Sequence, residues 1–297
     1  MSEPQKLTDA LLRSWPLPPP EGDRGKDSRG RVLVVGGAAQ TPGAVLLAAE
    51  SALRSGAGKL QIATVSSVSA HVAVATPEAL VVTLDETGEG GPVSDSADVL
   101  LKRGSRSDSV LLGPGWFEDD ATVELTRRFL HGVEPDGPAL VLDAAAMSGL
   151  AAEAERLRRL NGRVLLTPHA GEAATLLHRS REEVEAEPLA TAQEIASTLG
   201  CVVAMKGAVT FIAAPDGRSW VNEGGCVGLG TSGSGDTLAG LAAGLLARGA
   251  EPAKALAWAV YVHAQAGEIL AKRIGALGFL ARELPPEMPG VLSRLAD

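Results

Sequence analysis

The chain has few aromatic residues, few cysteines and an excess of negative charge. Aromatic residues make up 3% of its 297 residues, which weakens any proposal of base stacking on aromatic rings. The net charge of −9 argues against a nucleic-acid-binding surface, so an anionic ligand would have to be held by local groups. The two cysteines, Cys201 and Cys226, suit a reducing compartment, and Cys201 is expected in the core.

Several common signatures are also missing. The segment Gly233-Ser234-Gly235-Asp236 lacks the Gly-Lys-Ser/Thr ending of a Walker A motif. No Gly-x-Ser-x-Gly motif follows an expected strand, and no Cys and His residues have zinc-ligand spacing, which argues against a hydrolase triad and a zinc site. The first residues lack the apolar core of a signal peptide, and no stretch resembles a membrane span. We therefore expect a cytoplasmic protein that does not bind membranes.

The rest of the composition, 45% hydrophobic and 21% charged, is typical of a globular protein. Continuous apolar runs predict strands that are buried on both faces of a mostly parallel sheet. These strands span residues 32–35, 60–65, 79–84, 109–112, 140–142, 164–166 and 202–205, and residues 209–213 and 219–221 form a hairpin. Helices are expected at 7–15, 44–55, 120–130, 188–199, 237–246 and 253–272.

This alternation predicts one three-layer α/β/α domain over residues 31–297, preceded by a lead-in at residues 1–30. The basic residues between Gly22 and Arg31 form either a solvated linker or an anion-binding patch, and the linker is preferred. The tail, with Pro285, Pro286 and Pro289, is expected to be loosely packed.

Glycines and polar residues directly follow the expected strands. They are Gly36-Gly37, Gly113-Pro114-Gly115, Asp143, Thr167-Pro168-His169 and Lys206-Gly207. The carboxyl ends of parallel strands lie on one edge of a sheet, where open α/β sheets bind ligands. We therefore expect these residues to converge at one site.

The glycine-rich stretch 225–236 ends in Asp236 and precedes an apolar run of helical length, so Asp236 is expected near a helix N-terminus. Gly233 and Gly235 allow close approach of an anion, and the free N–H groups and the helix dipole attract one. The turn is therefore interpreted as a phosphate or oxyanion cradle. A carboxylate beside it suits deprotonation of a hydroxyl. The simpler alternative is an aspartate that only caps the helix.

Four further residues each have two interpretations. His169 contacts a ligand or bonds only to nearby backbone, and ligand contact is preferred. Glu172 orients a ligand or belongs to an ordinary first helical turn, and the second is preferred. Lys206 leaves a buried strand and needs an anionic partner, either a phosphate or a carboxylate. Asp143 binds a metal or caps a short helix, and capping is preferred.

Taken in order, these motifs resemble the ADP/ATP-dependent NAD(P)H-hydrate dehydratases. The matching segments are Gly43-Ala44, Arg54-Ser55-Gly56-Ala57-Gly58, Gly113-Pro114-Gly115, Thr167-Pro168-His169-Ala170-Gly171-Glu172, Lys206-Gly207 and Gly233-Ser234-Gly235-Asp236. The resemblance implies a ribokinase-like fold and an enzyme that uses ADP or ATP with Mg²⁺ to remove water from hydrated NADH or NADPH. It also implies a homo-oligomer such as a tetramer. Because the chain resembles the stand-alone dehydratase, a separate epimerase is expected to act alongside it.

The resemblance also assigns residues. Those that would contact the hydrate are Ala44, Gly115, His169 and Asp236, with Asp236 as the catalytic base. Those that would contact the adenine nucleotide are Lys206, Gly207, Ala208, Val209, Thr210 and Gly235. The metal ligands stay unassigned. In the implied reaction, a hydroxyl beside Asp236 takes a phosphoryl group and leaves as phosphate.

Three positions depart from the family pattern. Thr41-Pro42 replace an aromatic residue, and Cys226-Val227 replace an Asn-Pro pair, which affects the expected shape of the hydrate pocket. Ala145 replaces an aspartate, which removes one polar contact. The alternatives are a related small-molecule kinase, of the hydroxymethylpyrimidine or thiazole kinase type, and a non-catalytic nucleotide sensor. The complete Thr167–Glu172 motif favours the dehydratase over the kinases, and Asp236 argues against a sensor.

Overall fold

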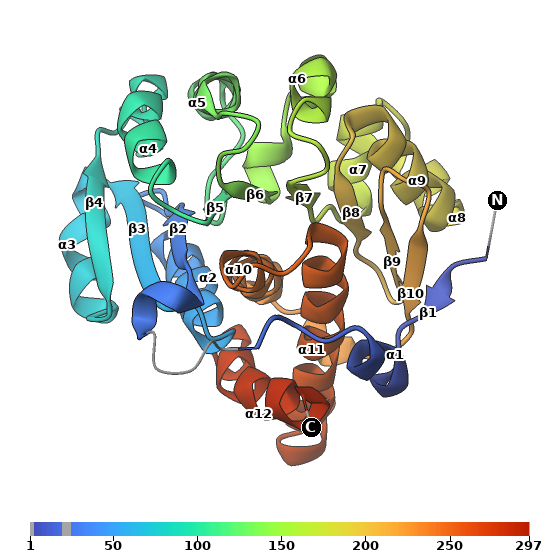
Figure 1. The fold of residues 1–297 in the computed structure, drawn as a ribbon. Helices are drawn as coiled ribbons and strands as arrows, with labels where there is room; N and C mark the ends of the chain where they lie inside the picture. Colours follow the sequence, from blue (N-terminus) through green and yellow to red (C-terminus); the bar gives the residue numbers. More distant parts are fainter. Residues whose placement is uncertain (1–2, 20–24, 297) are drawn as a thin grey trace.

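The computed structural model describes residues 3–19 and 25–296. Its centre is a single 10-stranded sheet (Figure 1). In order across the sheet, the strands are β1 (Gln5–Lys6), β10 (Ser219–Asn222), β9 (Thr210–Ala213), β8 (Val202–Met205), β7 (Val164–Leu166), β6 (Ala139–Leu142), β5 (Ser109–Leu112), β2 (Arg31–Val35), β3 (Lys59–Val65) and β4 (Ala79–Leu84). Strand β9 pairs antiparallel with both neighbours, and the other pairings are parallel. The predicted mostly parallel sheet and its hairpin are confirmed.

Helices cover both faces of the sheet, which makes the fold three-layered (Figure 1). One face carries α4 (Ala97–Gly104), α5 (Asp120–Gly132), α6 (Ala154–Arg158), α7 (Ala170–Leu177), α8 (Arg181–Ala186) and α9 (Pro188–Leu199). The other face carries α1 (Asp9–Ser14), α2 (Pro42–Arg54), α3 (Ser66–Ala75), α10 (Ser234–Ala247), α11 (Pro252–Arg273) and α12 (Leu284–Ala296). Short 3₁₀ helices are η1 (Lys26–Arg29), η2 (Ser94–Ser96), η3 (Ala144–Met147), η4 (Leu150–Glu153), η5 (Val227–Leu229) and η6 (Ala281–Glu283).

The continuous apolar strands explain the two helical layers. In β2, Val32 and Val34 belong to the core under α10 and α11, whereas Leu33 and Val35 belong to the core on the opposite face. All four side chains are fully buried. A strand with water on one face would alternate apolar and polar residues, so this pattern requires helices on both faces. Cys201 is buried in these cores, as expected, and so are Met205 and Trp258.

Helix α10 runs beneath the centre of the sheet, directly against α2. A side chain at Gly240 would collide with the Ala48 carbonyl oxygen, because a Cβ placed there would lie 2.0 Å from it. One helical turn on, a Cβ at Gly244 would lie 2.4 Å from the Ala52 carbonyl oxygen. The small residues of α10 therefore let the two helices pack in parallel at close range. This packing brings both helix N-termini to the same edge of the sheet.

The C-terminal tail is packed, so the prediction of a loose tail is wrong. Helix α12 buries Leu284, Met288, Val291 and Leu295, which share one helical face and join the core beside α2 and α11. Pro285 and Pro286 lie in the first turn of the helix, where a missing backbone N–H costs no helical hydrogen bond. The apolar periodicity outweighs the prolines as a predictor of this segment.

The described part of the N-terminal segment lies against the domain. Strand β1 extends the sheet beside β10, and Leu12 of α1 is fully buried. The Trp15 ring stacks on Trp220 at 5.4 Å between centroids. Asp27 pairs with Arg31 and Lys59, which fits the solvated linker better than an anion-binding patch; the prediction for residues 22–24 lies outside the described residues.

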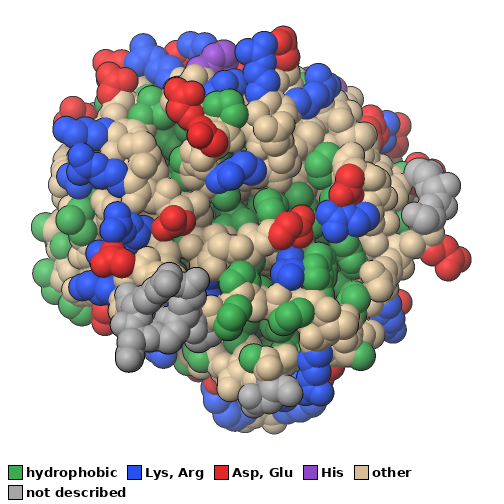
Figure 2. Space-filling model, viewed as in Figure 1, with side chains coloured by type: hydrophobic (Ala, Val, Ile, Leu, Met, Phe, Trp, Pro, Cys, Tyr) green, Lys and Arg blue, Asp and Glu red, His purple; other side chains and the backbone are tan. Residues whose placement is uncertain are grey.

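Charged side chains of both signs are intermixed around the rim of the face drawn in Figure 2, and hydrophobic side chains gather toward its centre. This distribution differs from the continuous basic patch of nucleic-acid-binding surfaces. Over residues 3–19 and 25–296, no helix combines the length and apolar composition needed to cross a lipid bilayer.

Candidate active site

The residues predicted to converge do so at the carboxyl edge of the sheet. Strands β2, β5, β6, β7 and β8 are consecutive parallel neighbours, so the segments that follow them lie side by side. The N-terminus of α10 reaches the same edge, because Gly235 lies beside the Lys206 ammonium group. The predicted convergence is confirmed.

The loops after β2 and β5 form one end of the site. Gly37 N donates to Pro114 O at 2.8 Å, and the Thr41 hydroxyl donates to Gly115 O at 2.6 Å. Gly115 has a φ of +71°, and a Cβ placed on it would lie 2.8 Å from Ala44 Cβ. The glycine therefore keeps a narrow space between the two loops. Ala44 and Gly115, both predicted to contact one ligand, are brought together.

The anion turn lies at the start of α10. The helix begins at Ser234 after Gly233, whose φ of +88° is costly for residues with a side chain. Asp236 is the third residue of the helix, and no cap hydrogen bond involves a side chain. The interpretation of Asp236 as a simple cap is therefore wrong. Ser234 N donates to Thr231 O at 3.2 Å, whereas the N–H groups of Gly235 and Asp236 have no intrahelical partners and offer an anion site beside a carboxylate.

A buried histidine that sequence reasoning missed holds this turn in place. His263 of α11 places Nε2 3.1 Å from the Ser234 hydroxyl oxygen and 3.0 Å from the Ser234 carbonyl oxygen. Because a carbonyl oxygen only accepts, Nε2 carries the proton. Burial and the nearby Lys206 ammonium lower the pKa of His263 to about 4, so the ring is neutral at pH 7. A lone histidine within an alanine-rich helix is the signal that could have revealed it.

The other end of the glycine-rich stretch is also anchored to α11. Glu268 accepts a hydrogen bond from Gly225 N at 2.9 Å, and the Asn222 side chain donates to Gly224 O at 3.0 Å. Helix α11 therefore fixes both ends of the stretch that leads to the anion turn.

Lys206 is surrounded by carboxylates. Its Nζ lies 3.4 Å from Asp143 Oδ1 and 3.8 Å from Glu172 Oε2. Burial favours the neutral amine, but these carboxylates outweigh burial and raise the pKa of Lys206. A Cβ placed on Gly235 would lie 3.4 Å from the same Nζ, so the ammonium also reaches the anion turn. Lys206 can therefore neutralise a carboxylate and an incoming anion together.

Asp143 serves the site rather than the helix that follows it. No cap hydrogen bond involves the Asp143 side chain at η3, so the preferred capping interpretation is wrong. Its Oδ1 instead accepts hydrogen bonds from the Thr167 hydroxyl at 2.6 Å and from Lys206. Asp143 and Thr167 are both buried. The pair fixes the position of the Lys206 ammonium group, a role that spacing along the chain did not predict.

The environment of Asp236 suits a base. Burial raises its pKa from an ordinary 3.8 to about 7, with further increases from the negative charges of Asp143 and Glu172, whereas Lys206 acts in the opposite direction. A carboxyl with a pKa near neutrality accepts a proton more readily than an ordinary carboxylate does, and a substantial fraction is still ionised at pH 7. Perturbed carboxyls of this kind cluster at functional sites.

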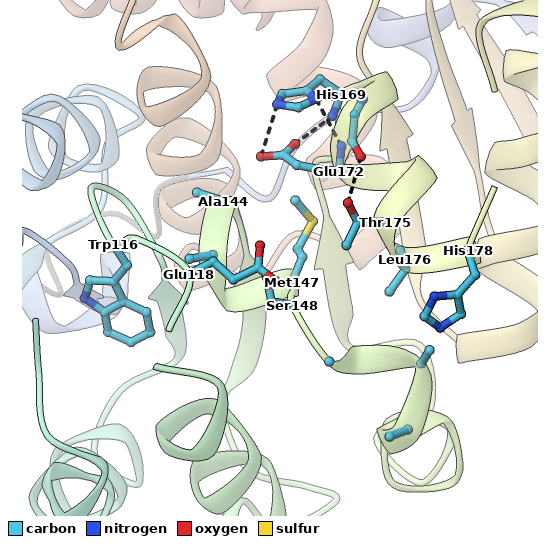
Figure 3. Close-up of a pocket in the computed structure, with 15 residues that line it drawn as sticks. Trp116, Glu118, Ala144, Met147, Ser148, His169, Glu172, Thr175, Leu176 and His178 are labelled. Carbon is cyan, nitrogen blue, oxygen red and sulfur yellow. Dashed lines mark hydrogen bonds and ion pairs between the residues drawn. The ribbon is translucent and has the colours of Figure 1, made fainter. Parts of the chain in front are cut away.

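His169 and Glu172 form a reciprocal cap at the start of α7 (Figure 3). His169 Nδ1 accepts from the N–H groups of Gly171 and Glu172 at 3.0 and 3.1 Å, and Glu172 accepts from His169 N at 2.7 Å. This confirms the helical role of Glu172. His169 makes the hydrogen bonds to nearby backbone that the less preferred of its two interpretations predicted. Because Nδ1 accepts, the ring N–H is at Nε2, which lies 3.6 Å from Glu172 Oε1 and can also donate to a ligand.

A cavity of about 760 Å³ opens beside Lys206, and we call it the Lys206 cavity. Its walls come from the β8–β9 turn, the stretch 224–231, the first turn of α10 and α11, including His263. Residues predicted to contact a nucleotide that line it are Lys206, Gly207, Ala208, Thr210 and Gly235. Val209 lines an adjoining cavity toward α8 and α9, which shares His169, Lys206, Gly207 and Ala208 with the Lys206 cavity. His169 borders the Lys206 cavity and also a second cavity, described below.

Within the described part of the chain, no three His, Cys, Asp or Glu side chains are grouped so that they could hold a metal ion by themselves. Mg²⁺ is commonly bound through one or two carboxylates together with substrate phosphates. Glu172, whose negative charge acts on Asp236, fits that arrangement, whereas a protein-only metal cage does not.

The chain is similar to proteins of known activity over nearly its whole length. A family model described as NAD(P)H-hydrate dehydratase matches residues 32–289. The ADP-dependent (S)-NAD(P)H-hydrate dehydratase of Xanthomonas campestris pv. campestris is 51% identical over 292 residues, 97% of this chain and 96% of the relative. Other curated relatives are bifunctional NAD(P)H-hydrate repair enzymes, and the chain spans about half their length.

Solved structures agree. The ADP/ATP-dependent NAD(P)H-hydrate dehydratase of Bacillus subtilis, co-crystallised with ATP and Mg²⁺, superposes with a TM-score of 0.81 at 28% identity, covering 99% of this chain and 100% of that one. A ribokinase-like superfamily protein from Enterococcus faecalis has a TM-score of 0.83 at 27% identity, covering 98% and 96%. The predicted ribokinase-like fold is confirmed. The chain belongs to the NAD(P)H-hydrate dehydratase family.

Proposed function

We propose that this protein removes water from hydrated NADH or NADPH and couples the reaction to hydrolysis of ADP or ATP. The observation that carries the proposal is the position of Asp236. Its carboxyl, with a pKa of about 7, lies in the first turn of α10 and in the electrostatic field of Lys206, and the preceding residue, Gly235, lines a cavity large enough for a nucleotide. The 51% identity to the Xanthomonas dehydratase supports the same activity.

The site divides into two halves. Lys206, the turn 207–210 and Gly235 are proposed to hold the adenine nucleotide, with its terminal phosphate at the N–H groups of the first turn of α10. Ala44, Gly115 and His169 are proposed to hold the hydrate, which enters from the opposite end of the edge. Asp236 lies where the two halves meet.

The proposed reaction has two stages. Asp236 accepts the proton of the added hydroxyl, whose oxygen bonds to the terminal phosphorus while the P–O bond to the leaving nucleotide breaks, which releases AMP from ADP or ADP from ATP. The ring-nitrogen lone pair then expels phosphate, and loss of a proton from the neighbouring ring carbon restores the double bond. Bound Mg²⁺, held through the nucleotide phosphates and a carboxylate such as Glu172, would neutralise phosphate charge. Lys206 and the α10 N-terminus supply fixed positive charge where negative charge develops.

A kinase of the same fold is the alternative, since it would use the same base and anion turn. The two are separated by measuring phosphate release from ADP and from ATP, with and without hydrated NADH. The dehydratase releases phosphate only when hydrate is present, and no phosphorylated product accumulates. Phosphate transfer to hydroxymethylpyrimidine or hydroxyethylthiazole, with no response to hydrate, would support the kinase.

The pH dependence provides a prediction about Asp143. Its negative charge helps to raise the pKa of Asp236, so Asp143→Asn should lower that pKa while still accepting the Thr167 hydrogen bond. Because the base must be deprotonated, kcat/KM of the wild type should rise with pH and level off above about 7. In Asp143→Asn the rising limb should move to lower pH.

The matched control is Asp108→Asn. Asp108 is a carboxylate at the amino edge of the sheet, where it accepts a hydrogen bond from Arg31 N. This variant should keep the wild-type profile. If Asp143→Asn also keeps that profile, Asp143 does not act on the base electrostatically.

We also propose that the protein is a homo-oligomer. The alanines of α11 are buried inside the chain, so they are not available to a partner. Exposed apolar side chains in the glycine-rich stretch, on α11 and in the segment after α11 provide other contacts: Val227, Ile269, Ile274, Leu277 and Leu280. Light scattering at micromolar concentration should give a multiple of the 30.4 kDa chain mass. A mass of one chain would contradict the proposal.

A further inference from the structure

A second cavity, of about 670 Å³, adjoins the candidate active site but has no role in the proposed transfer (Figure 3). We call it the Trp116 cavity. It lies between the β5–α5 loop, the segment 144–152 after β6, and α7. Among the lining residues, only His169 is shared with the Lys206 cavity. The two cavities therefore meet at the histidine that is expected to contact the hydrate.

The size of the proposed substrate calls for such a space. A hydrated nicotinamide dinucleotide consists of two nucleotides joined through a pyrophosphate. If its nicotinamide lies at Asp236 and the Lys206 cavity holds ADP or ATP, the adenosine half of the hydrate needs a place of its own. A volume of about 670 Å³ is within the usual range for small-molecule sites. His169 Nε2 lies 3.6 Å from Glu172 Oε1, and because its side chain is 59% exposed, its N–H can also donate to the pyrophosphate or a ribose at the junction.

The lining suits an uncharged base and sugar. Trp116, Met147 and Leu176 provide apolar surface, and Ser148 and Thr175 provide hydroxyl groups for a ribose. Glu118 and Glu172 contribute two carboxylates. The lining residues include two histidines, His169 and His178, but no lysine or arginine. Carboxylates accept hydrogen bonds from ribose hydroxyls, whereas a 2′-phosphate usually needs an arginine nearby.

We propose that the Trp116 cavity binds the adenosine half of the hydrated dinucleotide, and that Glu118 makes the enzyme prefer hydrated NADH over hydrated NADPH. This inference rests on the proposed function. It adds a subsite that neither the motifs nor the anion turn identify, and it names the group that discriminates at that subsite.

The first test blocks the cavity. Ala151 lies on its exposed rim, so Ala151→Trp should fill part of it without disturbing the core. The two substrates are hydrated NADH and the hydrate of reduced nicotinamide mononucleotide, which lacks the adenosine half. Ala151→Trp should lower kcat/KM for hydrated NADH by about tenfold or more, with kcat/KM for the mononucleotide hydrate and KM for ADP close to the wild type. The control is Ala73→Trp, on the exposed side of α3, which should match the wild type with both substrates.

The second test concerns charge. The wild type should use hydrated NADH more efficiently than hydrated NADPH, and Glu118→Gln should reduce the ratio of the two kcat/KM values by about fivefold. Glu78→Gln, an exposed carboxylate in the turn between α3 and β4, is the control. The proposed subsite would be overturned if Ala151→Trp lowers kcat/KM equally for the dinucleotide and mononucleotide hydrates, or lowers it for neither. The proposed role of Glu118 would be overturned if the ratio of kcat/KM for hydrated NADH to that for hydrated NADPH is at or below one in the wild type, or if Glu118→Gln leaves this ratio unchanged. Failure of the wild type to dehydrate any hydrate would instead overturn the proposed function.

Discussion

Replacing Asp236 by Asn should lower the single-turnover rate of hydrate dehydration by about 10²–10⁴-fold, the usual contribution of a general base. Asparagine keeps the shape of the side chain and its hydrogen-bonding capacity but cannot take the proton of the hydroxyl. Nucleotide affinity should hold or improve, because a negative charge beside the phosphates is removed. The control is Asp216→Asn, which changes an exposed carboxylate in the β9–β10 turn and should keep the wild-type rate. A near wild-type rate in Asp236→Asn would rule out Asp236 as the base.

The same variant, Asp236→Asn, should also show how much folding stability the protein loses when the partly buried Asp236 carboxyl ionises. The folded pKa of Asp236, about 7, lies above its ordinary 3.8, so between these values the folded protein binds a proton that the unfolded chain does not. Stability conferred by this group therefore falls as pH rises from about 4 to 7, and the penalty is complete above 7. Asp236→Asn lacks the penalty. Its melting temperature should exceed that of the wild type at pH 8, and the difference should shrink toward pH 5.

Replacing Lys206 by Ala should weaken nucleotide binding by about 1.5–3 kcal/mol, the usual size for a hydrogen bond to a charged group. The physical reason is the position of its Nζ, which is close to Gly235 at the anion turn as well as to Asp143. The pH dependence should change as well. Lys206 lowers the pKa of Asp236, so its removal should move the rising limb of the rate to higher pH, opposite to the effect of Asp143→Asn.

Calorimetry with ADP measures the affinity, and Lys254→Ala is the matched control. Lys254 lies at the start of α11 over the Trp15 ring, so its loss should leave ADP binding unchanged. If Lys206→Ala folds normally and binds ADP as tightly as the wild type, Lys206 serves only its ion pairs with Asp143 and Glu172.

Much of the fold follows from short-range patterns. Apolar runs predict the parallel strands, and the central ones β2, β5, β6, β7 and β8 are buried on both faces, whereas the edge strand β4 is partly exposed. The Pro215-Asp216-Gly217 turn predicts the β9–β10 hairpin. The apolar pattern does not predict α3 and α4. Both are short, and the serines and aspartates at their starts also favour turns. For α12, three prolines suggest a loose tail, although two of them lie where a helix tolerates them.

In the candidate site, too, some features follow from the sequence pattern and others depend on the three-dimensional packing. That residues after β5, β6, β7 and β8 meet at one edge follows from parallel topology alone. Which of them touch depends on register and on side-chain direction. Strand β7 lies between β6 and β8, so Asp143 and Lys206 follow strands that are two positions apart in the sheet. Asp143 accepts hydrogen bonds both from Lys206 and from Thr167, which follows β7. His263 is 29 residues from Ser234, and only the packing of α11 against α10 brings them together. The ligand-binding and catalytic roles assigned to the site residues, Asp236 and Lys206 included, stay predictions.

The most direct test of the proposed activity follows the optical absorbance of the reduced nicotinamide ring, which hydration abolishes. The purified protein is incubated with hydrated NADH, Mg²⁺ and either ADP or ATP. The proposed function predicts that absorbance of the reduced ring returns only when nucleotide is present, with one phosphate released for each ring restored. Nucleotide hydrolysis without return of the absorbance, or no reaction with either nucleotide, would contradict it.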